Sequence, residues 1–275
     1  MDETTLQVYS ALFVLATVAL TFTARYVRAR RSRRWAQRQI AGLGALAGWA
    51  EQAIESNRPL HLAFGSAGVG EDNTAAALAG AEFFHHAIDR VGAGDVSPIV
   101  STSAAATVPL GQDTLRRGWQ RGGALTRTQW FPQGRRAIGY AAAVSAVIES
   151  ERPSAHIFAG SFGPELALML DSADRRGHGS LAVSDQLPGQ AVAYAMADQV
   201  LIGEELFAAG AYVAAEGGAP ADAIVMDIWR ALLIAGMTAA LVLEASRQMP
   251  WLSWPAVAVV ALVLLGMGLL VYRRR

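Results

Sequence analysis

The sequence predicts an α/β domain with a parallel sheet, set between one apolar helix at the N-terminus and two at the C-terminus. The chain has 275 residues, is 53% hydrophobic and carries a formal net charge of zero. A chain of this length buries one sizeable core, and this one has apolar residues left over. Long apolar runs stand at both ends, and between them short apolar runs alternate with alanine-rich stretches. The ends are therefore expected in lipid, and the middle is expected to be an α/β domain.

The composition excludes several classes of protein. A balanced charge argues against nucleic-acid binding, because the neutralisation of phosphates needs a basic face. Cysteine is absent, which removes disulfides, thiolate nucleophiles and zinc sites built on sulfur. No lysine occurs either, so a lysine Schiff base and the lysine of a phosphate-binding P-loop are excluded.

The first apolar run, Leu6 to Thr23, contains no charged residue and is long enough to cross a bilayer as a helix. Asp2 and Glu3 precede it, and a cluster of arginines between Arg25 and Arg34 follows it. Because arginine is retained on the cytoplasmic side of a membrane, the end of this helix is expected in the cytoplasm. A cleaved signal peptide has the opposite charge order, so residues 1–24 are predicted to be an uncleaved transmembrane helix.

Residues 228–275 are predicted to form a transmembrane helical hairpin. Trp254 to Tyr272 is a strong apolar span, and the three arginines that follow it should stay in the cytoplasm. This orientation requires one more crossing, which Ile228 to Leu243 supplies. Glu244 to Ser253 would then face outward. We therefore expect a multi-pass protein of the inner (plasma) membrane, with the bilayer as a partner and the main domain in the cytoplasm.

Residues 25–58 are predicted to be an arginine-rich juxtamembrane segment with an amphipathic helix. From Arg38 to Ile54, apolar residues recur at spacings of three and four, as on one face of a helix. This helix could lie on the membrane surface and transmit the state of the domain. It could also be the first helix covering the sheet, and this interpretation is favoured because such helices are ordinary.

Residues 59–216 alternate between apolar runs and helical stretches, the pattern of βα units in a parallel sheet. The runs are almost entirely apolar, as expected where helices cover both faces of a sheet. The prediction is a Rossmann-like cytoplasmic domain, followed by a hinge at residues 217–227. The predicted strands are Leu60 to Phe64, Pro98 to Ser101, Thr128 to Phe131, His156 to Ala159, Leu181 to Val183 and Gln199 to Ile202. The predicted helices are Thr74 to Val91, Leu110 to Arg121, Ile138 to Ser150, Glu165 to Arg176, Gly189 to Ala197 and Glu204 to Ala214.

Ligands of open parallel sheets bind beyond the carboxyl ends of the strands, so the turns after the strands are the candidate sites. After the first strand, Gly65, Ser66, Gly68 and Gly70 form a turn whose backbone N–H groups could hold an anion. The alternative is a glycine turn that only lets the strand and helix pack closely. This spacing is not the dinucleotide fingerprint, and an acidic residue is missing after the second strand, so NAD is not expected. Ser101 and Thr102 stand at the end of this second strand, where the fingerprint would have the acidic residue.

A second glycine turn, with Gly160, Ser161 and Gly163, follows the fourth predicted strand. It superficially resembles the nucleophile elbow of serine hydrolases. Such an enzyme needs a histidine later in the chain at the same sheet edge, whereas His178 precedes the fifth strand and should lie at the opposite edge. We therefore expect Ser161 to bind a polar ligand rather than attack one.

Carboxylates mark the remaining strand ends. Glu204 follows Gly203 at the end of the sixth strand, and Asp185 ends the fifth. They could hold a divalent cation or a ribose-like hydroxyl, although a carboxylate also stabilises a helix N-terminus without any ligand. Glu82 and His85 match half of a di-iron motif, and the sequence holds no second copy. No metal ligand or catalytic residue is therefore assigned, and no cofactor is specified.

Three segments resemble a family of bacterial membrane-anchored Rossmann-like domains of unknown function. These segments read LAFGS (Leu62 to Ser66), GSFG (Gly160 to Gly163) and LIGEELFAAGAY (Leu201 to Tyr212). The resemblance covers Pro59 to Tyr212 and supports the domain limits and the importance of the turns. It implies no activity, because the family has no established substrate or catalytic residue.

Two functions from different classes fit this sequence best. One is a sensory or regulatory domain that binds a small anionic or nucleotide-like ligand. The other is a structural or assembly subunit of a membrane complex, which could be a homo-oligomer. An enzyme tethered to the membrane and using Glu204 and Asp185 is a third, less favoured reading, because no complete catalytic constellation is recognisable.

Overall fold

The computed structural model describes residues 3–30, 40–119, 127–133 and 137–214, together with 225, 229, 232–234 and 236–238. The chain divides into two compact units. One consists of Met1–Arg38 and Gly217–Arg275, and the other is Gln39–Glu216. The second unit is the α/β domain.

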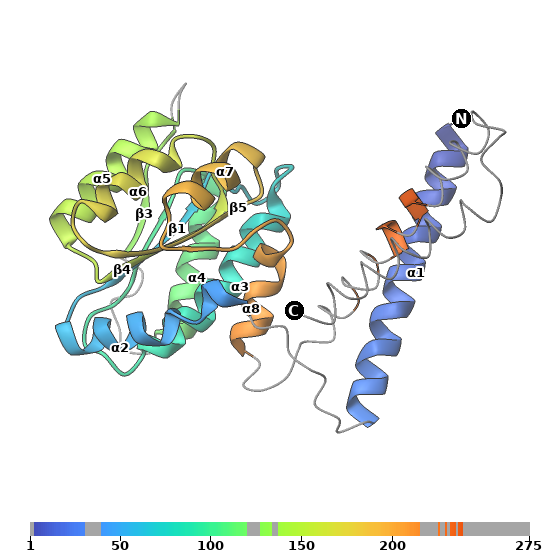
Figure 1. The fold of residues 1–275 in the computed structure, drawn as a ribbon, viewed down its shortest axis with the longest axis horizontal. Coiled ribbons are helices and arrows are strands. Elements are labelled where there is room, and N and C mark those ends of the chain that lie inside the picture. Colours follow the sequence, from blue (N-terminus) through green and yellow to red (C-terminus); the bar gives the residue numbers. More distant parts are fainter. Residues whose placement is uncertain are drawn as a thin grey trace, which may run out of the picture. The chain divides into compact units, whose positions relative to one another are not determined.

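The α/β domain is built on six parallel strands (Figure 1). Their order across the sheet is β3-β2-β1-β4-β5-β6, which is the order of Rossmann-type doubly wound sheets. The chain winds outward from β1 in one direction and then from β4 in the other, so the winding reverses between these two strands. The strands are β1 (Leu60–Gly65), β2 (Ile99–Thr102), β3 (Thr128–Trp130), β4 (Ala155–Ser161), β5 (Gly179–Ser184) and β6 (Gln199–Val200).

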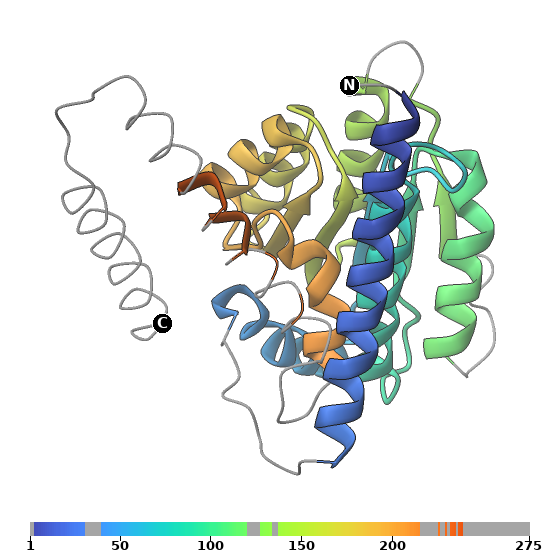
Figure 2. The same ribbon diagram turned by 90° about the vertical axis from the view of Figure 1, so that its right-hand side faces the viewer.

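The helices of this domain lie on both faces of the sheet, as the two views in Figures 1 and 2 show. One face is covered by α2, α3, α4 and α8, and the other by α5, α6 and α7. The helices are α2 (Leu46–Ser56), α3 (Thr74–Val91), α4 (Val108–Gly118), α5 (Ile138–Glu151), α6 (Leu166–Asp174), α7 (Leu187–Met196) and α8 (Glu205–Ala214). Short 3-10 turns, Ala41–Leu43 and Ala105–Thr107, precede α2 and α4.

Successive residues of each strand enter opposite core layers, because side chains alternate across a sheet. In β1, Leu62 and Phe64 pack against the α3 side, whereas Ala63 packs against α5 and α6. Every residue of β1 and β4 is buried. This burial explains why these strands read as mainly apolar runs rather than as alternating ones, with His61 and His156 as buried polar exceptions.

The predicted parallel sheet covered by helices is confirmed, and each strand begins within one or two residues of the predicted start. The predicted helix from Arg38 to Ile54 differs, because a 3-10 helix and a turn precede α2 (Leu46–Ser56), and residues 38–39 lie outside the described part. The cause is a contact with the sheet edge. A Cβ atom on Gly42 would lie 2.7 Å from the Val200 carbonyl oxygen, so this turn packs directly against the backbone of β6.

The described part of the other unit is mainly α1 (Glu3–Arg30), which contains the predicted helix Leu6 to Thr23. Among the residues that the structure describes, no helix is long and apolar enough to cross a membrane. The predicted span Trp254 to Tyr272 lies outside the described residues, as does nearly all of the predicted hinge.

Candidate functional site

The turns after β1 and β4 meet where the winding of the sheet reverses, which is the usual ligand position in doubly wound folds. Gly65 pairs with Ser161 across the two strands. The Ser66 backbone N–H and hydroxyl both donate to the Ser161 carbonyl oxygen, at 2.8 and 3.0 Å. Two turns about 95 residues apart in sequence are thereby held together.

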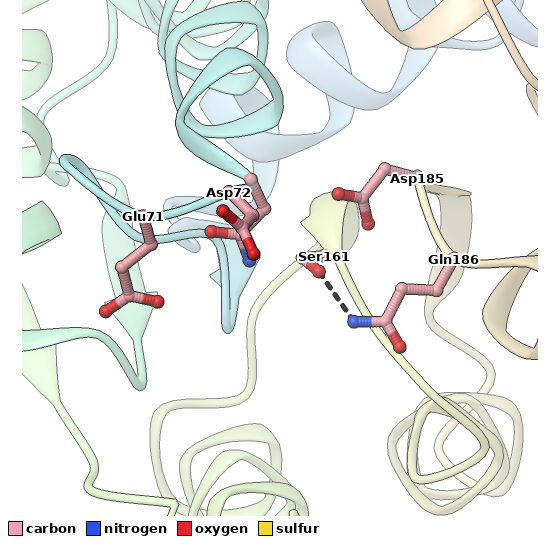
Figure 3. A pocket seen from close by; sticks show the side chains of 6 residues that line it. Glu71, Asp72, Ser161, Asp185 and Gln186 are labelled. Atoms are coloured by element: carbon pink, nitrogen blue, oxygen red, sulfur yellow. Dashed lines mark hydrogen bonds between the residues drawn. The ribbon is translucent and has the colours of Figure 1, made fainter. Parts of the chain in front are cut away.

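An open cleft of about 610 Å³ lies at this edge of the sheet (Figure 3). Asp72 lies on one side of it, and Asp185 and Gln186 lie on the other. The turn before α3 supplies one wall, β4 the floor, and the turn after β5 the opposite wall. The lining residues are Glu71, Asp72, Asn73, Ser161, Asp185 and Gln186.

Ser161 is the central polar group of the cleft floor. Its hydroxyl oxygen accepts a hydrogen bond from Gln186 Nε2 at 2.7 Å, drawn as the dashed line in Figure 3. Its hydroxyl group also donates to the Asp185 carboxylate. Burial raises the pKa of Asp185, and the Ser161 hydrogen bond opposes that rise. This arrangement presents a carboxylate acceptor and an amide donor side by side.

The glycine turn after β1 folds on itself rather than pointing its N–H groups outward. Gly68 N–H donates to Asn73 Oδ1 at 2.9 Å, and Gly70 N–H donates to Thr74 Oγ1 at 2.8 Å. Val69 N–H donates to Thr107 Oγ1. The backbone N–H groups at positions 66, 67 and 71 donate to carbonyl oxygens. Because each donor already has an acceptor, the turn is not arranged as an anion-binding nest.

The turn after β4 is satisfied in the same way. Phe162 N–H donates to Ser184 Oγ at 3.0 Å, and Gly163 N–H donates to Glu165 Oε1 at 2.7 Å. The Glu165 carboxylate therefore occupies the place that an anionic ligand would need. Gly160 serves packing, because a Cβ atom there would lie 2.2 Å from the Phe64 carbonyl oxygen.

Other predicted site residues lie outside the cleft lining. Ser101 is fully buried and hydrogen-bonds inward to His61 and Tyr140. Thr102 is also buried, and its hydroxyl bonds the backbone of its own turn. Gly203 takes a left-handed conformation, with φ of +60°, and Glu204 follows it one strand beyond Asp185.

Sequence reasoning missed four lining residues, Glu71, Asp72, Asn73 and Gln186. Each directly follows a turn or strand that had been singled out, so its position in the sequence was the available signal. Across the described ranges, no group of three or more histidine, aspartate and glutamate side chains could hold a metal ion. The site therefore offers hydrogen-bonding groups and negative charge.

Comparison with known proteins gives a match to one protein family. No curated protein matches the chain, and no solved structure matches it. The model of one family, described as "Domain of unknown function (DUF6754)", matches residues 2–252. Because this match spans most of the sequence, the chain belongs to the DUF6754 family.

Proposed function

We propose that the α/β domain is a sensory or regulatory module that binds a small, hydroxyl-rich ligand of nucleoside type in the cleft beside Ser161. The observation that carries this proposal is the position of the cleft at the reversal point of the sheet, together with its lining. Carboxylate acceptors at Asp72 and Asp185 suit sugar hydroxyls. The amide nitrogens of Asn73 and Gln186 already donate to Ser66 O and Ser161 Oγ, and each carries a second N–H for a ligand.

Electrostatics separates this proposal from the binding of a phosphate. Three carboxylates line the cleft, and like charges repel an anion. The two glycine turns have no donors to spare, because their N–H groups bond internal acceptors. A neutral or cationic group is therefore favoured over the anionic ligand that the sequence suggested.

The test is a thermal-shift titration of the full-length protein with adenosine and with ATP. Adenosine is expected to raise the melting temperature, and ATP is expected to act more weakly because its phosphates meet the carboxylates. Asp185→Asn should weaken the adenosine effect, whereas Asp174→Asn, an exposed change on α6, should not. Equal binding of ATP, or an Asp185→Asn variant that behaves like the parent, would contradict the proposal. Mass spectrometry of compounds retained by the purified protein widens the search beyond these two probes.

We further propose that α1 anchors this module in the plasma membrane. Large apolar side chains on this helix are exposed, among them Phe13, Leu15 and Phe22. The hydroxyls of Thr17 and Thr21 donate to carbonyl oxygens four residues earlier, which satisfies them without water. Lipid is the solvent that suits such a surface.

Cysteine labelling in intact cells tests the proposed topology. Ser253→Cys should react with an impermeant thiol reagent, and Gly217→Cys should react only after the cells are opened. The reverse pattern would overturn the orientation. Extraction of the protein by carbonate without detergent would overturn the anchor itself.

A second candidate function is assembly. Helix α7 exposes Leu187 by 78% and Tyr194 by 72%, and these residues, seven positions apart, lie on one face of the helix. Tyr194→Glu should then reduce the mass of the complex in size-exclusion chromatography with light scattering. Tyr26→Glu on α1 provides a control outside the α/β domain. An unchanged mass would leave the ligand-binding proposal as the better one.

A further inference from the structure

A row of hydrogen-bonded side chains runs through the α5 side of the sheet and connects its two edges. It begins in the connection between α2 and β1, crosses β4, β1 and β2, and ends on α5. Four of its members, His61, Ser101, Tyr140 and His156, are at most 1% exposed, and His178 is 7% exposed. We call this set the histidine row, which in spatial order consists of Arg58, His178, His156, His61, Ser101 and Tyr140.

The first half of the histidine row joins Arg58 to three imidazoles. Arg58 Nη2 lies 2.8 Å from His178 Nε2, and His178 Nδ1 lies 3.1 Å from His156 Nε2. His156 Nδ1 then lies 3.2 Å from His61 Nδ1. His61 and His156 face each other because they are register partners on neighbouring strands.

The second half reaches the turn beside the cleft. His61 Nε2 lies 2.8 Å from Ser101 Oγ, and Ser101 Oγ lies 3.1 Å from the Tyr140 hydroxyl. The Gly65 backbone N–H also faces the Tyr140 hydroxyl oxygen, because it acts to lower the pKa of Tyr140. Gly65 begins the glycine turn and pairs with Ser161 on the cleft floor. The row therefore links the amino-terminal edge of the sheet to the candidate site.

The chemistry of arginine fixes the direction of each hydrogen bond from Arg58 as far as Ser101. A guanidinium group has only donors, so His178 Nε2 must accept from Arg58 and His178 Nδ1 must carry the proton. His156 then accepts at Nε2 and donates from Nδ1 to His61, which leaves the proton of His61 on Nε2. Ser101 Oγ accepts the hydrogen bond from His61 Nε2, and between Ser101 and Tyr140 either hydroxyl can be the donor. One donor at the edge thus orders three tautomers.

The surroundings keep all three imidazoles neutral, which this order requires. Burial lowers the pKa of His61 and of His156, and it is also the largest cause of the lowered pKa of His178. The positive charge of Arg58 lowers the pKa of His156 and His178 further. Arg58 is itself held in place by the carbonyl oxygens of Arg152 and Pro153, at 2.6 and 3.0 Å.

We propose that the histidine row is a directional coupling element, in which Arg58 sets the tautomers of His178, His156 and His61 and thereby the hydrogen bonding of Ser101 and Tyr140 beside the Gly65 turn. A change at the connection between α2 and β1 would be transmitted to the edge that holds the cleft without a rearrangement of the backbone. The row is independent of which ligand, if any, the cleft binds.

The tautomers can be read directly by nitrogen NMR of the full-length protein, labelled with ¹⁵N-histidine and reconstituted in lipid vesicles. The sequence has five histidines, so His85→Gln and His86→Gln leave only the signals of the histidine row. The expected result is a proton on Nδ1 of His156 and His178 and on Nε2 of His61. Any other distribution, or a charged imidazole at neutral pH, would overturn the proposed direction.

Coupling is tested by replacing Arg58, the first hydrogen-bond donor of the row. In protein that is also labelled with ¹⁵N-glycine, Arg58→Met should shift the ring nitrogen signals of His61 and the amide signal of Gly65, although the hydrogen bonds of Arg58 go to Arg152, Pro153 and His178. Arg58→Lys is the matched control, because it keeps a cationic donor, and it should leave the His61 tautomer unchanged. If His61 and Gly65 keep their parent signals in Arg58→Met, the coupling does not exist.

Ser101→Ala gives an independent cut if Arg58→Met does not fold. This change removes the acceptor of His61 and leaves Arg58 intact, so His178 and His156 should keep their tautomers. The amide signal of Gly65 should shift, because Tyr140 loses its hydrogen-bond partner Ser101. An unchanged Gly65 signal in a folded Ser101→Ala variant, or changed tautomers of His178 and His156, would overturn the proposal.

Discussion

Lowering the pH from 7 to 5 is expected to destabilise the α/β domain, because buried histidines cannot take up protons that the unfolded chain accepts. Burial lowers the pKa of His61 from its usual 6.5 to about 3. Between these values the unfolded state binds one proton more at this side chain, so the stability falls as the pH falls. The contribution is complete above pH 6.5 and disappears as the pH approaches 3.

The magnitude follows from the size of this window. Each pH unit between the two pKa values changes the free energy of unfolding by about 1.4 kcal/mol, so His61 alone removes about 2 kcal/mol at pH 5. His156 acts in the same direction, because burial lowers its pKa as well. Asp185 acts in the opposite direction, because its pKa is raised in the folded state. For a domain of this size, 2 kcal/mol corresponds to a fall in melting temperature of about 4–8 °C.

The assay is urea unfolding of the full-length protein at pH 7.5, 6 and 5, followed by circular dichroism. Most carboxylates of the unfolded chain remain ionised at pH 5, so this range isolates the histidines. The double variant His85→Gln, His86→Gln should retain most of the loss, since His61 is unchanged in it. Equal free energies of unfolding at pH 7.5 and 5 would refute the neutral, buried state of the histidine row.

Two further changes test the packing of the sheet. Gly160→Ala should cost about 1–3 kcal/mol of unfolding free energy, because its Cβ atom would meet the Phe64 carbonyl oxygen at 2.2 Å. Gly48→Ala, in a helix with nothing within 4 Å, should be neutral or stabilising, and equal effects of the two changes would contradict the close approach. Phe84→Ala should cost about 3–5 kcal/mol, since its buried ring packs edge-on against Phe64 with centroids 4.6 Å apart. Phe207→Ala, at a side chain that is 44% exposed, should cost clearly less, as thermal unfolding of the purified variants can show.

The sequence alone predicted the six parallel strands and the helices between them. Both faces of such a sheet are covered, so each strand is a short apolar run that stands out from its polar and glycine-rich neighbours. The reversal of winding between β1 and β4 was not visible, because strand order depends on contacts between distant segments. The 3-10 turn before α2 was missed for the same reason, since the close approach of Gly42 to Val200 spans most of the domain.

The candidate site shows the same division. Glycine turns and strand ends could be located from the sequence, because turn chemistry is local and the carboxyl ends of parallel strands share one edge. The sequence could not show that the N–H groups of those turns are already bonded to Asn73, Thr74 and Glu165. Because these N–H groups are already bonded, the site is not the expected anion site. It is an acidic cleft whose carboxylates can accept hydrogen bonds from the hydroxyl groups of a ligand.

The histidine row shows most clearly what could not be predicted from the sequence. His61, His156 and His178 lie far apart in the sequence, and in a list of residues they look like isolated polar positions. Local patterns determined which segments form strands and turns, because backbone propensity and periodicity act over a few residues. Only the tertiary structure decided which side chains touch, because strand order and register place distant residues within hydrogen-bonding distance and remove them from water.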